Sequence, residues 1–132
     1  MPVQLMQAPD GVLGTMKNIA FESQAVAWLL YDGWQVFRPV LDNGHKTDIL
    51  ISDGIQYFRI QVKTVSVSRR YAEVENQWEG YDIDYVIYFA RDGYWGYIAP
   101  AFKEKKRLLE HPEHKFFRLK RRAFLSAFHS MD

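Results

Sequence analysis

The chain has 132 residues, 48% of them hydrophobic and 25% charged, so it can bury the core of one soluble domain. It contains no cysteine, which excludes disulfides, thiolate metal sites and a cysteine nucleophile. No apolar run reaches the roughly 20 residues that span a bilayer, and residues 1–14 do not resemble a signal peptide. We therefore expect a cytoplasmic protein with no membrane partner.

Charge is unevenly distributed along the chain, although the net charge is only +1. Residues 1–100 hold 8 basic and 12 acidic side chains, whereas residues 101–132 hold 9 and 4. An acidic body with a basic tail suits a protein that binds a polyanion and gathers carboxylates around a metal ion. A solvated basic helix is the alternative explanation for the tail.

The first expected elements are a helix and a short strand. Proline and glycine in residues 1–14 predict an irregular lead, after which Thr15 is placed to cap a helix that ends at Gly33. Residues 34–40 then form a strand that ends near Pro39.

One carboxylate stands out in the predicted helix. Ile19, Val26 and Leu29 recur on one helical face, and Glu22 falls on that same face. A carboxylate is costly to bury without a partner, so this position favours a cation or a metal-bound water. The alternative is an exposed acid near the helix start, stabilised by the helix dipole.

Residues 48–65 are predicted to form a β-hairpin around the Asp53-Gly54 turn. A four-residue loop over 53–56 aligns the apolar faces of the two strands and sets Asp48 opposite Gln61, with Lys63 on the same side. A two-residue loop would set Asp48 opposite another residue and retain less apolar pairing.

Asp48, Gln61 and Lys63 together suit metal-assisted hydrolysis of a phosphodiester. A carboxylate and an amide oxygen are ligands for a hard cation, which lowers the pKa of a bound water. A neighbouring lysine can orient or deprotonate that water, or stabilise negative charge in the transition state. The alternative is a solvated polar face of an ordinary strand.

The remainder of the chain is predicted in coarser terms. Residues 66–84 show no clear period, and residues 85–90 and 94–100 form a second strand pair. A short basic helix is expected over 101–110, after Pro100, followed by a strand over 115–119 and a helix over 121–129.

This order of elements and residues resembles the PD-(D/E)XK nuclease superfamily, especially Holliday-junction-resolvase-like and homing-endonuclease-like members. The matching patterns are KxxxFE (17–22), LxxxGW (29–34), DILI (48–51), IQVKT (60–64) and DYVIYF…YIAP (84–100). The resemblance implies an α/β, restriction-endonuclease-like core with a mixed central sheet of αβββαβ type. It implies one domain over 1–132, with a lead over 1–14, a core over 15–100 and a basic helical segment over 101–132.

The resemblance also implies roles for the site residues. Asp48 would be the principal metal ligand and Lys63 the catalytic lysine, while Glu22 would complete the site from the helix. Gln61 would occupy the acidic position of the motif, and the backbone carbonyl of Val62 would add a ligand. The implied cofactor is Mg²⁺, with Mn²⁺ able to substitute, and the implied activity is DNA endonuclease.

Two departures from the family pattern bear on activity. Pro39 lies nine residues before Asp48, so the literal PD pair is absent, and Gln61 stands where the motif has Asp or Glu. One fewer charge would weaken metal binding. The alternative function is therefore a catalytically inactive DNA-binding or protein-interaction module of the same fold.

Several basic and polar residues are candidates for contacts with DNA, and a plain solvated surface is the alternative for each. One active site reaches one scissile phosphate, so cutting both strands would require a homodimer or homotetramer. The candidate DNA contacts are Lys17, His45, Arg69, Arg70, Lys103, Lys105, Lys106 and Arg107.

Overall fold

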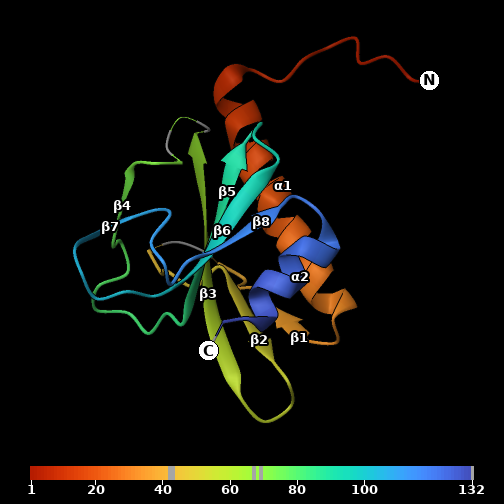
Figure 1. The fold of residues 1–132 in the computed structure, drawn as a ribbon. Coiled ribbons are helices and arrows are strands. Elements are labelled where there is room, and N and C mark those ends of the chain that lie inside the picture. The colour runs from red at the N-terminus through yellow and green to blue at the C-terminus, as the bar shows by residue number, and fades with distance from the viewer. Residues whose placement is uncertain (42–43, 67, 69, 132) are drawn as a thin grey trace.

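A mixed β-sheet forms the centre of the molecule, with helices on one face and a small second sheet on the other (Figure 1). The computed structural model describes residues 1–41, 44–66, 68 and 70–131. Within these residues, six strands pair in the order β1-β2-β3-β5-β6-β8, and β4 pairs separately with β7. The strands are β1 Gln35–Phe37, β2 Ile49–Ser52, β3 Tyr57–Ser66, β4 Glu73–Glu75, β5 Tyr85–Arg91, β6 Trp95–Pro100, β7 Lys106–Leu108 and β8 Lys115–Arg118.

The pairing of β3 with β5 is parallel, and the other neighbours in both sheets are antiparallel. The α/β class with a mixed central sheet is confirmed. The predicted αβββαβ order, however, would place a helix in the crossover between the parallel strands β3 and β5. The described part of residues 67–84 contains β4 and irregular chain there instead, and the second helix follows β8.

The first helix, α1, spans Asp10–Tyr31, so the prediction that it starts after Thr15 was wrong. Pro9 directly precedes the helix, and its ring fixes φ at the helix start. Asp10 lies in the first turn, where its negative charge interacts favourably with the helix dipole. The Thr15 hydroxyl donates a hydrogen bond to the Gly11 carbonyl inside the helix, 3.3 Å away. Gly33 has φ of +99° and ends the helix as predicted.

The second helix, α2, spans Arg121–His129 and packs beside α1 on the same face of the sheet (Figure 1). Together they cover a core of aliphatic and aromatic side chains from β2, β3, β5, β6 and β8. Of the described helices, neither is long and apolar enough to cross a membrane. The fully buried members of this core include Leu29, Ile49, Ile51, Ile60, Ile87, Phe89, Ile98, Phe117 and Phe124.

The opposite face of the sheet carries a second core, formed with β4, β7 and the chain around them. Alternation along β5 supplies both cores, because Ile87 and Phe89 face the helices whereas Val86 and Tyr88 face the second sheet. The polar face of β3 that includes Lys63 is therefore also covered in part by β4.

The segment 101–120 is not helical, which corrects two predictions: the helix over 101–110 and the helical nature of the whole 101–132 tail. Phe102 and Leu109 are buried in the second core, and β7 between them pairs with β4. These tertiary contacts override the helix propensity of the Lys- and Glu-rich sequence. The predicted strand and helix that follow are confirmed as β8 and α2.

His114 gives the second core a pH-dependent stability. Its side chain is 6% exposed, and Nδ1 donates to the Leu109 carbonyl over 2.8 Å. Burial lowers the pKa of His114 to about 4, from 6.5. Between these values only the unfolded chain binds the proton, so the free energy of unfolding falls as pH drops from about 6.5 to 4, by about 3 kcal/mol.

Urea denaturation at a series of pH values should show this slope in the wild type. His114→Gln should flatten it, and His45→Asn, at an exposed loop position, should leave it unchanged. If the free energy of unfolding depends on pH equally in the wild type and in His114→Gln, His114 is not the source of this pH dependence.

Candidate active site

The β2–β3 hairpin has the register that the sequence predicts. Ile49 pairs with Ile60, so Asp48, one residue earlier, lies across from Gln61. The loop is the four-residue turn, held by Asp53, whose Oδ1 accepts hydrogen bonds from two backbone N–H groups of the loop at 2.9 and 2.8 Å. This local turn fixes which side chains share the polar face of β3.

Asp48 lies directly before β2, at the point where the pairing of β2 with β3 stops and the edge of β3 opens. Its backbone N–H donates to the Ile60 carbonyl (2.9 Å), and its Oδ2 accepts from the Val62 N–H (2.8 Å). The carboxylate thus accepts the hydrogen bond from Val62 N–H that a backbone carbonyl would accept if the pairing of the two strands continued. Because the N–H and C=O of one strand residue point to the same side, the Val62 carbonyl faces this opening as well.

Glu22 comes to the same place from α1. Together with Asp48, Val62 and Lys63 it lines a hollow of about 390 Å³. Glu22 is half-buried, which fits the prediction of an inward carboxylate, although Ile19 on the predicted face is 55% exposed. Two carboxylates from distant parts of the chain therefore share one hollow at the edge of the sheet.

Contacts between α1 and the strands hold this arrangement. The Asn18 side-chain oxygen accepts from the Thr64 hydroxyl at 2.8 Å and from Arg91 Nη2 at 2.6 Å. Asn18 lies one turn before Glu22 on the helix, so these bonds set the distance of that turn from β3 and β5.

Lys63 projects from β3 next to the two carboxylates and is half-buried. Burial lowers the pKa of Lys63, Asp48 opposes that shift, and Lys46 adds to it. The ammonium is therefore less favoured than in an exposed lysine.

Gln61 is the predicted ligand whose placement differs most from the others. Its side chain is 4% exposed, and it is not part of the lining of the 390 Å³ hollow. Its Oε1 atom is buried with no hydrogen-bond partner among the described residues. A buried amide oxygen without a partner is costly, so this atom suits a role as a ligand to a cation.

The donor set suits Mg²⁺ better than zinc. Among the described residues, no group of three or more His, Cys, Asp or Glu side chains is placed to hold a metal. Mg²⁺ is commonly held by one or two carboxylates and keeps several waters. Asp48 and Glu22 would supply the carboxylates and the Val62 carbonyl a neutral oxygen, whereas Gln61, which does not line this hollow, stays a predicted ligand.

The predicted DNA contacts near the N-terminal half of the chain are scattered. Lys17 on α1 forms an ion pair with Asp92 over 3.5 Å. His45 is exposed and lines a separate hollow, with Arg38 and Arg59, rather than the one that contains Asp48. The loop before Asp48 and Arg59 of β3 therefore form a separate group of basic side chains around this second hollow.

Arg69 lies outside the described residues. Its neighbour Arg70 packs its guanidinium over the rings of Tyr71, Trp95 and Phe116, at 5.5, 5.7 and 4.8 Å from their centroids. These cation–π contacts give Arg70 a structural role on this surface.

In the tail, Lys103, Lys105 and Lys106 are exposed, as a contact with phosphates requires. Arg107 is different, because its guanidinium pairs with the carboxylates of Glu104 and Glu113. Its charge is therefore offset by these two carboxylates, and its role as a phosphate contact stays a prediction.

Three residues of the hollow were missed in the sequence: Asn18, Gln77 and Thr64, which follows Lys63 on β3. Asn18 could have been found, since it precedes Glu22 by one helical turn and shares its face. Gln77 also lines the hollow, from the chain after β4, where the sequence has no clear period. No local signal pointed to Gln77.

The structure resembles that of a bacterial homing endonuclease, I-Ssp6803I, with a TM-score of 0.55 and 19% sequence identity over 70% of this chain and 72% of that chain. At this level of identity the similarity is one of fold. No protein-family model and no curated protein matches the sequence.

Proposed function

We propose that the protein is a Mg²⁺-dependent DNA endonuclease of the PD-(D/E)XK type, in which Mn²⁺ substitutes for Mg²⁺. The observation that carries the proposal is the meeting of Glu22, Asp48 and Lys63 in one hollow beside the start of β2. The fold shared with a homing endonuclease supports it. The DNA substrate is either branched, as for a Holliday-junction resolvase, or a linear site, as for a homing endonuclease.

Each residue has a role that follows from its place. Asp48, held by the Val62 N–H, and Glu22, fixed on α1, would hold the cation. The cation would supply a water of lowered pKa and neutralise charge on the phosphate. Lys63 would orient that water or receive its proton, and its positive form would stabilise the phosphorane-like transition state.

The proposal extends to the assembly. One such hollow reaches one scissile phosphate of the DNA, so a homodimer or homotetramer would cut both strands. The exposed cations Lys103, Lys105 and Lys106 would contribute affinity for the DNA backbone. A cytoplasmic setting remains part of the proposal.

Asp48→Asn is expected to weaken Mg²⁺ and Mn²⁺ binding at least about tenfold, because it removes a ligand charge while keeping an oxygen that can accept from Val62 N–H. Isothermal titration calorimetry measures this directly, and circular dichroism checks the fold. Asp82→Asn replaces an exposed carboxylate by the same amide and is the matched control, so it should bind both cations as the wild type does.

If the wild type binds neither cation, or if Asp48→Asn binds as tightly as the wild type, the endonuclease proposal is wrong. Gln61 then favours the second candidate, an inactive DNA-binding or protein-interaction module, because a neutral side chain stands in the acidic position. Supercoiled plasmid, linear duplex and a four-way junction, each incubated with protein and Mg²⁺, separate the two functions by the presence of nicked product.

A further inference from the structure

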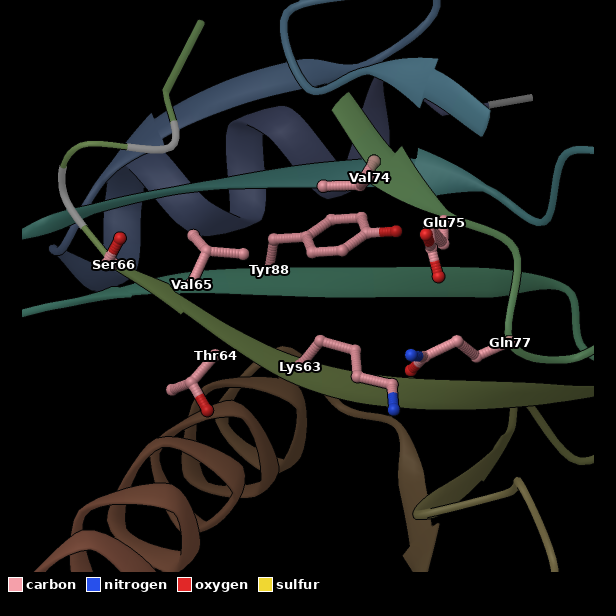
Figure 2. A pocket seen from close by; sticks show the side chains of 8 residues that line it. All are labelled: Lys63, Thr64, Val65, Ser66, Val74, Glu75, Gln77 and Tyr88. Atoms are coloured by element: carbon pink, nitrogen blue, oxygen red, sulfur yellow. The ribbon is translucent and has the colours of Figure 1, made fainter. Parts of the chain in front are cut away.

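A second hollow adjoins the candidate active site on the face of β3 that β4 covers (Figure 2). Its volume is about 530 Å³. Lys63, Thr64 and Gln77 line both this hollow and the one that contains Asp48, so the two are continuous around the edge of β3. Figure 2 shows the ends of the Lys63 and Gln77 side chains directed toward one another at this junction.

The walls of the second hollow combine apolar surface with a few polar groups. Val65, Val74 and the ring of Tyr88 form its apolar part, while the Glu75 carboxylate and the Gln77 amide stand at its exposed side. A binding site for a small organic group has this composition and falls in this range of volume.

Tyr88 provides an independent sign that the hollow receives a ligand. Its side chain is 3% exposed, and its hydroxyl is buried with no hydrogen-bond partner among the described residues. Figure 2 shows the hydroxyl directed toward Glu75 across the hollow. Burial raises the pKa of Tyr88, so the hydroxyl stays protonated and remains a donor.

The charges of the hollow argue against a second phosphate. Lys63 and Glu75 carry opposite charges, and the carboxylate would repel an anion. A neutral, planar group with donors and acceptors on its edge fits both the apolar walls and the polar side. Gln side chains pair with adenine in this way, and Glu accepts from the amino group of cytosine.

We propose that this hollow receives one unstacked nucleobase of the DNA strand, next to the scissile phosphate, and that Glu75 and Gln77 select that base by hydrogen bonding. The inference rests on the proposed function, since the phosphate bound near Lys63 places the neighbouring base at the shared wall. An unpaired or mismatched base enters most readily, because unstacking then costs least. Lys106, which pairs with Glu75 over 4.0 Å, stands at the rim beside the flanking backbone.

The first test uses fluorescence in EDTA, so that binding is observed without metal-dependent cleavage. A linear duplex and a four-way junction each carry a single 2-aminopurine, placed in turn at every position around the cut mapped for the wild type. Emission should rise at one position on binding, since an unstacked 2-aminopurine is no longer quenched. Glu75→Gln and Gln77→Ala should reduce that rise, whereas Glu73→Gln, on the same strand but outside the hollow, should retain it.

The second test sequences the product ends from a library that is randomised on both sides of the cut. The wild type should prefer one base at the position next to the cut by about fivefold or more, and Glu75→Gln should change that preference. Glu73→Gln should leave it unchanged.

The outcomes separate this inference from the proposed function. If the wild type cleaves DNA but emission rises at no position, or Glu75→Gln matches Glu73→Gln in both assays, the base site is wrong and the endonuclease stands. If the wild type neither binds nor cleaves any of these DNAs, the proposed function fails and the base site fails with it.

Discussion

Lys63→Met is expected to slow DNA cleavage by about 10²- to 10⁴-fold, the range associated with a positioned acid–base group. The side chain is half-buried beside Asp48, and methionine keeps its length and apolar stem while removing the amino group. Cation binding should survive, because the proposed ligands are oxygen atoms of other residues. Single-turnover cleavage of plasmid in Mg²⁺, with calorimetric titration of the same variant, measures both quantities.

Two further variants sharpen this experiment. Lys120→Met removes the same charge from an exposed position and controls for a general loss of affinity for DNA. Lys63→Arg restores a positive charge that does not deprotonate. Recovery of cleavage by arginine assigns an electrostatic role to Lys63, and no recovery assigns a role in proton transfer. Cleavage by Lys63→Met within about threefold of wild type would remove Lys63 from the catalytic group, given the size expected for such a group.

The hairpin could be predicted because its signals are local. Alternation with a period of two gives the faces of β2 and β3, and the Asp53-Gly54 turn fixes their register. Asp48, Gln61 and Lys63 follow from that register alone. The convergence of Glu22 with Asp48 required the resemblance to a family, because no local pattern relates a helix residue to a strand 26 positions later.

The parts that escaped prediction depend on contacts between distant segments. β4 and β7 have three residues each and pair across about 30 positions, so neither segment shows a period of its own. The basic segment of β7 has helix-favouring residues, and its pairing with β4 and the burial of Phe102 and Leu109 explain why it is extended. Gln77 reaches the hollow because β4 is anchored there, which explains why its role was not visible in the sequence.

The predicted start of α1 was wrong for a different reason. Gly11 and Gly14 weaken a helix by roughly 0.5–1 kcal/mol each, yet Pro9 and Asp10 start it earlier than Thr15. Asn18 then docks α1 onto Thr64 and Arg91, and this contact stabilises the first turns from outside the helix. Propensity placed the start too late because it does not include such docking.

Gly96→Ala is expected to lower the free energy of unfolding by about 3 kcal/mol or more, at the upper end of overpacking in a core. Gly96 lies in β6, where a Cβ atom would be 2.3 Å from Phe117 Cζ and 2.3 Å from the Tyr88 carbonyl oxygen. The Phe117 ring is 1% exposed, and the carbonyl belongs to the central strand β5, so neither has room to move. Urea denaturation gives the difference in stability.

The same substitution should also disturb the candidate site, because Tyr88 on β5 pairs directly with Lys63 on β3. Gly11→Ala is the matched control: its Cβ atom would meet nothing within 4 Å, and alanine should stabilise α1 by about 0.5–1 kcal/mol. Adding Phe117→Leu to Gly96→Ala should restore only part of the stability, because the contact with the Tyr88 carbonyl remains. If the free energy of unfolding of Gly96→Ala lies within about 1 kcal/mol of the wild-type value, β5 and β6 are not as rigidly spaced as this close packing requires. The placement of Lys63 opposite Tyr88 then does not depend on Gly96.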